Sequence, residues 1–174
     1  LLLIHYLVKY KGMRGKVVTA FSCSVKIEKI CKHYDLDQET VKIGFKHIAG
    51  KMVSENILLG GEESGGIATA GHIPERDGIW MGLILFEFMA KSGKTLDELI
   101  EEVYQIVNPF KFERSDLHIT EELKQGIIAN CKAGKYEGFG EYTIRNIETI
   151  DGFKFFLDDE RWVMIRPSGT EPVL

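Results

Sequence analysis

Two different patterns of apolar residues divide this chain, and the change between them falls at Asn108-Pro109. Before that point, short β-branched runs of strand length alternate with stretches that place apolar residues on one helical face. This alternation predicts an α/β domain with a mixed, largely parallel sheet and helices on both faces. The expected strands are Lys16–Phe21, Val41–Phe45 and Asn56–Leu59, and the expected helices are Val25–Tyr34, Lys46–Val53, Ile79–Lys91 and a last one ending at Val107.

The second part of the chain predicts a smaller α+β domain with an antiparallel sheet. Thr120–Lys132 has the pattern of one amphipathic helix, and three short β runs follow it. Asp151-Gly152 is a tight-turn signal that joins the first two runs as a hairpin. We therefore expect two domains, over residues 1–107 and 108–174. The three β runs are Tyr142–Ile150, Phe153–Leu157 and Trp162–Arg166.

One helix of the first domain has an unusual composition. Ile79–Lys91 is apolar almost all round, which predicts that this helix is largely buried. Gly93 is expected to end it. Thr95 and Glu98 then have the spacing of a capping box, in which both side chains satisfy backbone amides at the start of the next helix.

Charge and residue counts exclude several kinds of partner. The chain has 22 basic and 26 acidic residues without a long run of either sign, which argues against nucleic acid. Three cysteines without a C-x-x-C spacing indicate buried, reduced thiols and a cytoplasmic protein. Five scattered histidines, with no pair at metal-ligand spacing, predict that this chain has no metal site of its own.

The two ends of the sequence are abrupt. The apolar run Leu1–Ile4 is too short to span a membrane and lacks the basic leader of a signal peptide, so no membrane association is expected. This run is typical of a helix entered part-way, and the chain stops at Leu174 without a polar tail. We expect both ends to be cuts in a longer protein.

A glycine-rich segment, Gly60–Gly66, follows the expected strand Asn56–Leu59 directly, and we call it the first loop. In α/β proteins such a loop lies at the carboxyl edge of the sheet, where ligands commonly bind. Glu62 and Ser64 are two residues apart and point the same way if the backbone stays extended. A carboxylate beside a hydroxyl suits vicinal hydroxyls, as on a sugar ring. The alternative is a glycine-rich turn with solvated acidic side chains. The segment is not a phosphate-binding P-loop, because the closing Gly-Lys-Ser/Thr of that motif is missing.

A second loop, Arg166–Pro172, follows the last β run and concentrates donors for an anion. Arg166 offers a planar fork of N–H groups, and Ser168 and Thr170 add hydroxyls. Gly169 allows backbone amides to face inward as an anion-binding nest. A hydrogen bond to a charged group contributes roughly 1.5–3 kcal/mol, so several of them hold a phosphate firmly. The alternative is a hairpin end with a surface arginine.

Four motifs, in order, resemble the α-D-phosphohexomutase superfamily, which comprises the phosphoglucomutases and phosphomannomutases. The superfamily's G-E-x-S-G sugar-recognition motif matches Gly61–Gly65, and its R-P-S-G-T-E-P phosphate motif matches the second loop without a mismatch. Arg76–Gly78 matches a K/R-D-G element, and Gly44–Ile48 resembles a G-F-K-Y-I segment. The resemblance covers essentially the whole chain.

This resemblance implies that the chain holds most of the third and fourth domains of a four-domain enzyme. The first domain of the superfamily carries a catalytic serine in a T-A-S-H-N-P-like segment, and the second carries a D-G-D-x-D-R magnesium loop. Neither string occurs here. The ligands of Mg²⁺ and the catalytic serine are therefore expected in missing domains 1 and 2 of the same protein, and the fragment alone is expected to be inactive.

The resemblance also implies a reaction. A phosphoserine gives its phosphoryl group to a hexose phosphate, and a hexose bisphosphate intermediate returns the other phosphate, which interconverts the 1- and 6-phosphates. Glu62 and Ser64 would hold ring hydroxyls that both orientations of the sugar present. The phosphate that is not reacting would be clamped by Arg166, Ser168, Gly169 and Thr170.

Two further residues each have a predicted role and an alternative. Lys46 would lie near the reacting phosphate and offset its developing charge; an ordinary surface lysine is the alternative. Arg76 is a possible substrate contact, and a salt bridge to Asp77 or Glu75 explains it equally well. The alternative function is a non-catalytic phosphosugar-binding module. The Glu-Glu-Ser form of the first loop favours glucose over glucosamine and leaves mannose open.

Overall fold

The computed structural model describes residues 1–167. The chain divides into two compact units, Leu1–Lys111 and Phe112–Leu174, and each is described by itself. The division falls a few residues beyond the boundary expected after residue 107.

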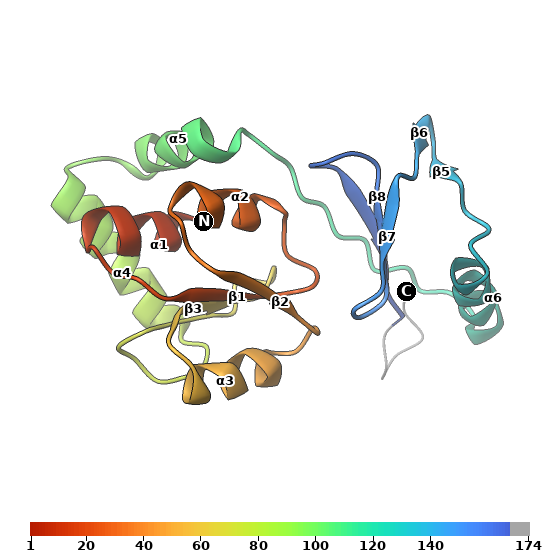
Figure 1. The fold of residues 1–174 in the computed structure, drawn as a ribbon, viewed down its shortest axis with the longest axis horizontal. Helices are drawn as coiled ribbons and strands as arrows, with labels where there is room; N and C mark the ends of the chain where they lie inside the picture. Colours follow the sequence, from red (N-terminus) through yellow and green to blue (C-terminus); the bar gives the residue numbers. More distant parts are fainter. Residues whose placement is uncertain (168–174) are drawn as a thin grey trace. The chain divides into compact units, whose positions relative to one another are not determined.

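A four-stranded sheet forms the centre of the first unit (Figure 1). Its strands lie in the order β2-β1-β3-β4; β1 pairs in parallel with both β2 and β3, and β4 runs antiparallel to β3. The prediction of a mixed, largely parallel sheet is confirmed. The strands are β1 Lys16–Ala20, β2 Gln38–Val41, β3 Ile57–Gly61 and β4 Ile67–Thr69.

Helices cover both faces of this sheet, as predicted (Figure 1). Val17 and Val18 are neighbours on β1, so they point to opposite faces, and they belong to two separate apolar clusters. Helix α3 covers the Val18 face, and the other helices of the unit pack in the cluster of Val17. The helices are α1 Leu2–His5, the π-helical turn η1 Tyr6–Tyr10, α2 Lys26–His33, α3 Phe45–Ser54, α4 Gly78–Ser92 and α5 Leu96–Val107.

The expected strand Val41–Phe45 is wrong. β2 ends at Val41, and the chain already enters α3 at Phe45. Gly44 is the reason, because its φ of +119° turns the chain in a conformation that favours glycine, and it serves as the N-cap residue of α3. The strand uses the polar residues before Val41 instead, which an edge strand accommodates because one of its sides has no neighbour.

Strand β3 continues beyond the expected Asn56–Leu59 and includes Gly60 and Gly61 of the first loop. A Cβ atom at Gly60 would lie only 2.2 Å from Cγ2 of the buried Ile48 on α3. Glycine is therefore required here because the helix packs directly on the strand backbone. The glycine excess of this segment thus serves helix packing as well as the turn.

We expect Gly60→Ala to lower the free energy of unfolding by about 1–3 kcal/mol, because its methyl group overpacks the contact with Ile48. Urea denaturation followed by circular dichroism measures the change. The matched control is Gly50→Ala on α3, where an added Cβ meets nothing within 4 Å. Alanine in a helix interior should be neutral or slightly stabilising there. Equal destabilisation by both variants would contradict the packing role of Gly60.

Helix α4 forms where it was expected, but the prediction that it is largely buried is wrong. One side faces the core, and the opposite side is apolar and exposed, because the first unit places neighbouring elements on one side of the helix only. The core side comprises Met81, Ile84 and Phe88. The exposed side comprises Ile79, Leu83 and Phe86, with 80%, 56% and 69% of their surface accessible.

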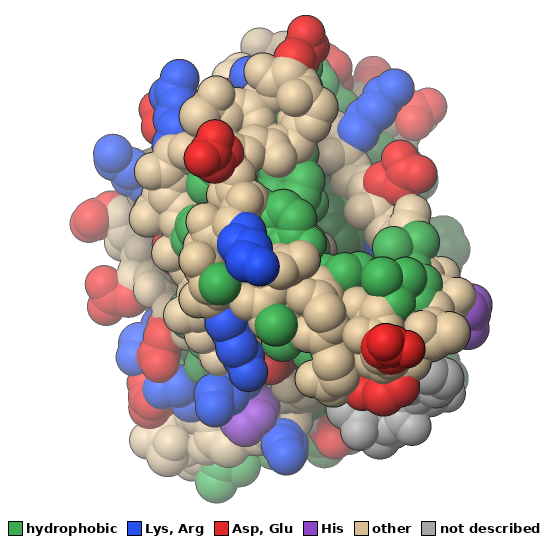
Figure 2. All heavy atoms as spheres, turned by 90° about the vertical axis from the view of Figure 1, so that its right-hand side faces the viewer, with side chains coloured by type: hydrophobic (Ala, Val, Ile, Leu, Met, Phe, Trp, Pro, Cys, Tyr) green, Lys and Arg blue, Asp and Glu red, His purple; other side chains and the backbone are tan. Residues whose placement is uncertain are grey.

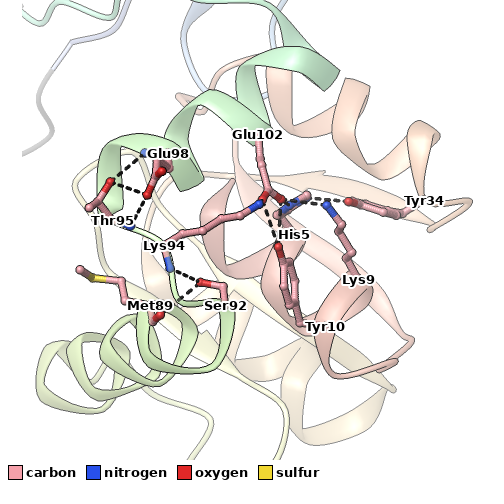
Figure 3. Close-up of polar contacts among 10 residues, drawn as sticks. All are labelled: His5, Lys9, Tyr10, Tyr34, Met89, Ser92, Lys94, Thr95, Glu98 and Glu102. Carbon is pink, nitrogen blue, oxygen red and sulfur yellow. Dashed lines mark hydrogen bonds and ion pairs between the residues drawn. The ribbon is translucent and has the colours of Figure 1, made fainter.

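Helix α5 begins as predicted. The Thr95 hydroxyl accepts from the Glu98 backbone N–H at 3.3 Å, and the Glu98 carboxylate accepts from the Thr95 N–H at 2.7 Å (Figure 3). Both halves of the capping box are therefore present, and α5 ends at Val107.

The second unit contains the predicted helix and antiparallel strands. Thr120 caps α6, and the turn at Asp151-Gly152 joins β7 to β8 in the antiparallel meander β7-β8-β9. The expected single strand Tyr142–Ile150 is wrong, because its residues are shared between β6, which pairs with β5 in a separate ribbon, and β7. The elements are α6 Glu121–Lys132, β5 Gly138–Phe139, β6 Tyr142–Thr143, β7 Asn146–Glu148, β8 Phe153–Phe156 and β9 Trp162–Ile165.

A polar network around the buried His5 ties α1 and η1 to α5 (Figure 3). His5 is 1% exposed; its Nε2 lies 2.9 Å from Glu102 Oε2, and its Nδ1 lies 2.6 Å from the Tyr34 hydroxyl. Because a carboxylate only accepts, Nε2 carries the proton and Nδ1 accepts from the tyrosine. Glu102 also accepts from further donors on either side. These are Lys9 at 2.8 Å, Tyr10 at 3.1 Å and Lys94.

This network should make the first unit less stable in acid. Burial lowers the pKa of His5, although the hydrogen bond to Glu102 opposes the shift. Burial alone would raise the pKa of Glu102, but its donors outweigh burial and lower it. Both groups therefore bind protons more readily in the unfolded chain. The contribution of both groups to the free energy of unfolding is fully present above about pH 6.5. As the pH falls below this value, the contribution of His5 is lost first. Below about pH 4.5, the contribution of Glu102 is lost as well.

We expect Glu102→Gln to lower the free energy of unfolding at pH 7 by about 1–3 kcal/mol, because charge-assisted hydrogen bonds become neutral ones. The difference from the wild type should narrow below about pH 4.5, where the unfolded wild-type carboxyl is protonated. Urea denaturation at pH 7, 5 and 4 measures both effects. The control is Glu101→Gln, an exposed neighbour on α5, which should change little. A difference that stays constant with pH would contradict the role of Glu102.

Candidate functional site

The first loop lies at the carboxyl edge of the parallel strands, beside two other turns. β3 leads into this loop, β1 leads to Ser22, and β2 leads to the Gly44 turn that begins α3. Because β1 lies between β2 and β3 and all three are parallel, these three turns share one edge of the sheet. This is the edge at which α/β proteins bind ligands.

The backbone of the first loop closes on itself. The Glu62 N–H donates to the Gly66 carbonyl at 2.9 Å, and the Gly65 N–H donates to the Glu62 carbonyl at 3.2 Å. Gly65 has φ +87°, a conformation that favours glycine. The extended backbone that would point Glu62 and Ser64 the same way is therefore absent. The Glu62 side chain is only 9% exposed, whereas Ser64 is exposed.

The Glu62 carboxylate bridges two other segments. Its Oε1 accepts from the Gly44 N–H at 3.2 Å, and its Oε2 lies 3.5 Å from Nη1 of Arg76. The Arg76 guanidinium also lies over the Phe45 ring, 5.3 Å from the centroid. Glu62 therefore connects the first loop to the start of α3 and to the turn before α4.

Glu63, the next residue, anchors the first loop to β1. Its carboxylate accepts a hydrogen bond from the Ser22 hydroxyl, and the neighbouring Cys23 thiol lies 3.6 Å from the Gly61 carbonyl. Sequence reasoning missed Ser22. Its signal was available, because Ser22 directly follows the strand expected at Lys16–Phe21 and so had to lie at the same sheet edge as the first loop.

Lys46 lies in the first turn of α3, two residues after the Gly44 turn. Its side chain is exposed. Lys46 is thus an exposed residue two positions after Gly44, whose N–H donates to Glu62.

Of the two salt bridges considered for Arg76, the one to Glu75 is present and the one to Asp77 is not, and Glu62 is a further partner. Arg76 contacts Glu75 at 3.3 Å and Glu62 at 3.5 Å, whereas Asp77 caps α4 by accepting from the Trp80 N–H at 2.9 Å. This cap bond, followed by the bond to His72 at 2.8 Å, lowers the pKa of the Asp77 carboxyl. His72 also stacks on Trp80, with ring centroids 4.6 Å apart.

The second loop begins directly after β9. Nε of Arg166 lies 3.4 Å from Oδ2 of Asp151 in the hairpin turn, and the side chain is 38% exposed. Gly152 packs closely on Arg166, since an added Cβ would lie 3.0 Å from the Arg166 Cβ. The remaining predicted phosphate ligands, Ser168, Gly169 and Thr170, lie outside the described residues.

Both basic and acidic side chains are visible on the face of the molecule shown in Figure 2. No group of three His, Cys, Asp or Glu side chains within residues 1–167 is arranged to hold a metal ion. None of the helices in this part of the chain is both long and apolar enough to cross a membrane.

Comparison with known proteins identifies relatives of the whole chain. Residues 1–107 match the family model described as phosphoglucomutase/phosphomannomutase, alpha/beta/alpha domain III. A phosphoglucomutase/phosphomannomutase of Thermococcus kodakarensis is 31% identical over 92% of this chain and 33% of its own length. A phosphoglucosamine mutase of Methanocaldococcus jannaschii is 31% identical over 98% of this chain and 36% of its own length. The chain thus spans about a third of the length of these relatives.

Solved structures have the same fold. A protein of Thermus thermophilus assigned to the phosphomannomutases superimposes with a TM-score of 0.73 at 27% identity, over 95% of this chain and 33% of that one. The phosphoglucomutase parafusin of Paramecium superimposes with a TM-score of 0.78 at 20% identity, over 97% and 33% of the two chains. At 20% identity, the second similarity concerns the fold alone.

Proposed function

Because this chain belongs to the phosphoglucomutase/phosphomannomutase family, we propose that it is the substrate-recognition portion of a phosphohexomutase. The parent enzyme would interconvert hexose 1-phosphates and hexose 6-phosphates through a phosphoserine and a hexose bisphosphate. The observation that carries the proposal is the position of the first loop, whose carboxylate is fixed at the carboxyl edge of a parallel sheet. The full-length relatives are mutases, which supports the enzyme class.

In this proposal the first loop recognises the sugar. Glu62 is held by Gly44 and Arg76, and its carboxylate oxygens keep lone pairs for sugar hydroxyl donors. Ser64 adds an exposed hydroxyl that can donate or accept. Hydroxyl groups common to both orientations of the sugar would bind here, so that one site serves both halves of the reaction.

The second loop would clamp the phosphate that is not reacting. Arg166 supplies charge and a planar fork, and the hydroxyls and backbone amides after it complete the set. The assigned residues are Arg166, Ser168, Gly169 and Thr170. Lys46 would offset charge on the reacting phosphate, because phosphoryl transfer depends on positioning and electrostatics. The ligands of Mg²⁺ and the phosphoserine would lie in other domains of a cytoplasmic parent protein, as the family resemblance implies.

A comparison of turnover rates tests which substrate is preferred and whether catalysis requires the other domains of the parent enzyme. We expect full-length enzyme to convert glucose 1-phosphate faster than glucosamine 1-phosphate, with mannose 1-phosphate in the same assay to decide whether it shares the site. The 174-residue chain alone should give no turnover and only weak binding of glucose 1-phosphate. Measurable turnover by this chain would refute the proposal that the catalytic groups lie in other domains. Saturable binding, with no mutase activity in the full-length protein either, would favour a non-catalytic phosphosugar-binding module.

A further inference from the structure

Glu62 is a nearly buried carboxylate, and it depends on two partners from other segments. A carboxylate removed from water must be compensated by donors. Here one oxygen accepts from the Gly44 N–H, and the other is paired with Arg76. Because the carboxylate is one planar group, losing Arg76 would let it rotate and would alter its hydrogen bond to the Gly44 N–H as well. The orientation of the carboxylate therefore depends on Arg76.

Arg76 is itself held, although its side chain is 54% exposed. Its aliphatic stem lies against the first loop, since a Cβ at Gly66 would be 2.5 Å from the Arg76 Cδ. Its guanidinium lies over the face of the Phe45 ring, which is a favourable site for a cation. Nε pairs with Glu75. The arginine is therefore fixed at three points before any ligand binds.

The local charge does not favour a phosphate at this arginine. Arg76 is paired with two carboxylates, those of Glu62 and Glu75, so the three side chains together carry one negative charge. A dianionic phosphate placed here would meet two carboxylates within the reach of one guanidinium. A neutral hydroxyl has no such penalty, because it can donate to a carboxylate oxygen.

We infer that Arg76 is a positioning residue, which orients the Glu62 carboxylate toward sugar hydroxyls and does not itself bind the substrate phosphate. This inference rests on the proposed role of Glu62 in sugar binding. The arginine of the K/R-D-G element would thus act on Glu62 of the first loop. Phe45 would hold the guanidinium in place through the contact with its ring.

A double-mutant cycle in the full-length enzyme tests the inference. We expect Arg76→Met to lower kcat/KM for glucose 1-phosphate by about 5- to 20-fold, mainly by raising KM, because a misplaced carboxylate loses hydrogen bonds to the bound sugar. Arg76→Lys should recover part of this loss. When Glu62 is already replaced by glutamine, adding Arg76→Met should lower kcat/KM by less than a further factor of about 2. The reason is that Arg76 acts through the Glu62 carboxylate, which this background lacks. Lys32→Met, an exposed charge change on α2, is the matched control and should be silent.

A structural readout on the 174-residue chain completes the test. The Gly44 amide resonance should move in both Arg76→Met and Glu62→Gln, and should not move in Lys32→Met. Additive losses in the double mutant would overturn the inference, because Arg76 would then contact substrate by itself. An unmoved Gly44 amide in Arg76→Met would overturn it as well. If Glu62→Gln alone leaves the kinetics unchanged, the proposed sugar role fails instead, and the Gly44 resonance still decides whether Arg76 positions Glu62.

Discussion

Replacing Arg166 with alanine in the full-length enzyme is expected to lower kcat/KM for hexose phosphates by about 10- to 150-fold. One charge-assisted hydrogen bond contributes roughly 1.5–3 kcal/mol, and each 1.4 kcal/mol is about tenfold in affinity. The loss should fall mainly on KM if the clamped phosphate is bound equally in the ground and transition states. Steady-state kinetics with glucose 1-phosphate and its bisphosphate measure it.

Two further variants make the Arg166 prediction specific. Arg166→Lys keeps the charge but loses the planar fork, so its kcat/KM should lie between those of the wild type and Arg166→Ala. Arg161→Ala is the matched control, because Arg161 is an exposed arginine of the same unit that pairs with Asp158. Wild-type kinetics in Arg166→Ala, with circular dichroism showing an intact fold, would exclude the phosphate clamp.

Glu62→Gln is the second change with a large expected effect. The amide keeps the size of the side chain but loses the negative charge, so hydrogen bonds from sugar hydroxyls and from the Gly44 N–H weaken. We expect kcat/KM for glucose 1-phosphate to fall by about 10- to 100-fold, which corresponds to roughly 1.4–2.8 kcal/mol. Discrimination between glucose and mannose phosphates should fall with it, because Glu62 would read hydroxyl positions.

Glu63→Gln is the matched control for this prediction. It also removes one negative charge, at the residue next to Glu62. The Glu63 carboxylate accepts a hydrogen bond from Ser22 and so anchors the first loop to the end of β1. Its cost in kcat/KM should stay below about 5-fold, since a glutamine oxygen can still accept from the serine hydroxyl. If the two variants behave alike, or if Glu62→Gln keeps normal sugar discrimination, direct recognition by Glu62 is wrong.

The exposed apolar side of α4 shows that a sequence pattern can predict a helix without predicting how much of it is buried. A helix that is apolar all round predicts burial without specifying the element that buries it. In the described chain, Met81 and Phe88 find neighbours in the core, whereas Leu83 and Phe86 do not. Periodicity identified the helix correctly, because it is a local property of the sequence. Burial depends on which other elements pack there.

Sequence alone determined the alternating strands and helices, the capping box at Thr95, the hairpin turn at Asp151-Gly152, and the motifs that place the chain in its family. Each of these is encoded by residues close together in the chain, so local conformational preference decides them. Only the tertiary structure decided that Gly60 is needed for the approach of α3, and that Glu62 is shared between Gly44 and Arg76. Those contacts join residues from separate turns, and the register of three parallel strands is what brings the turns together.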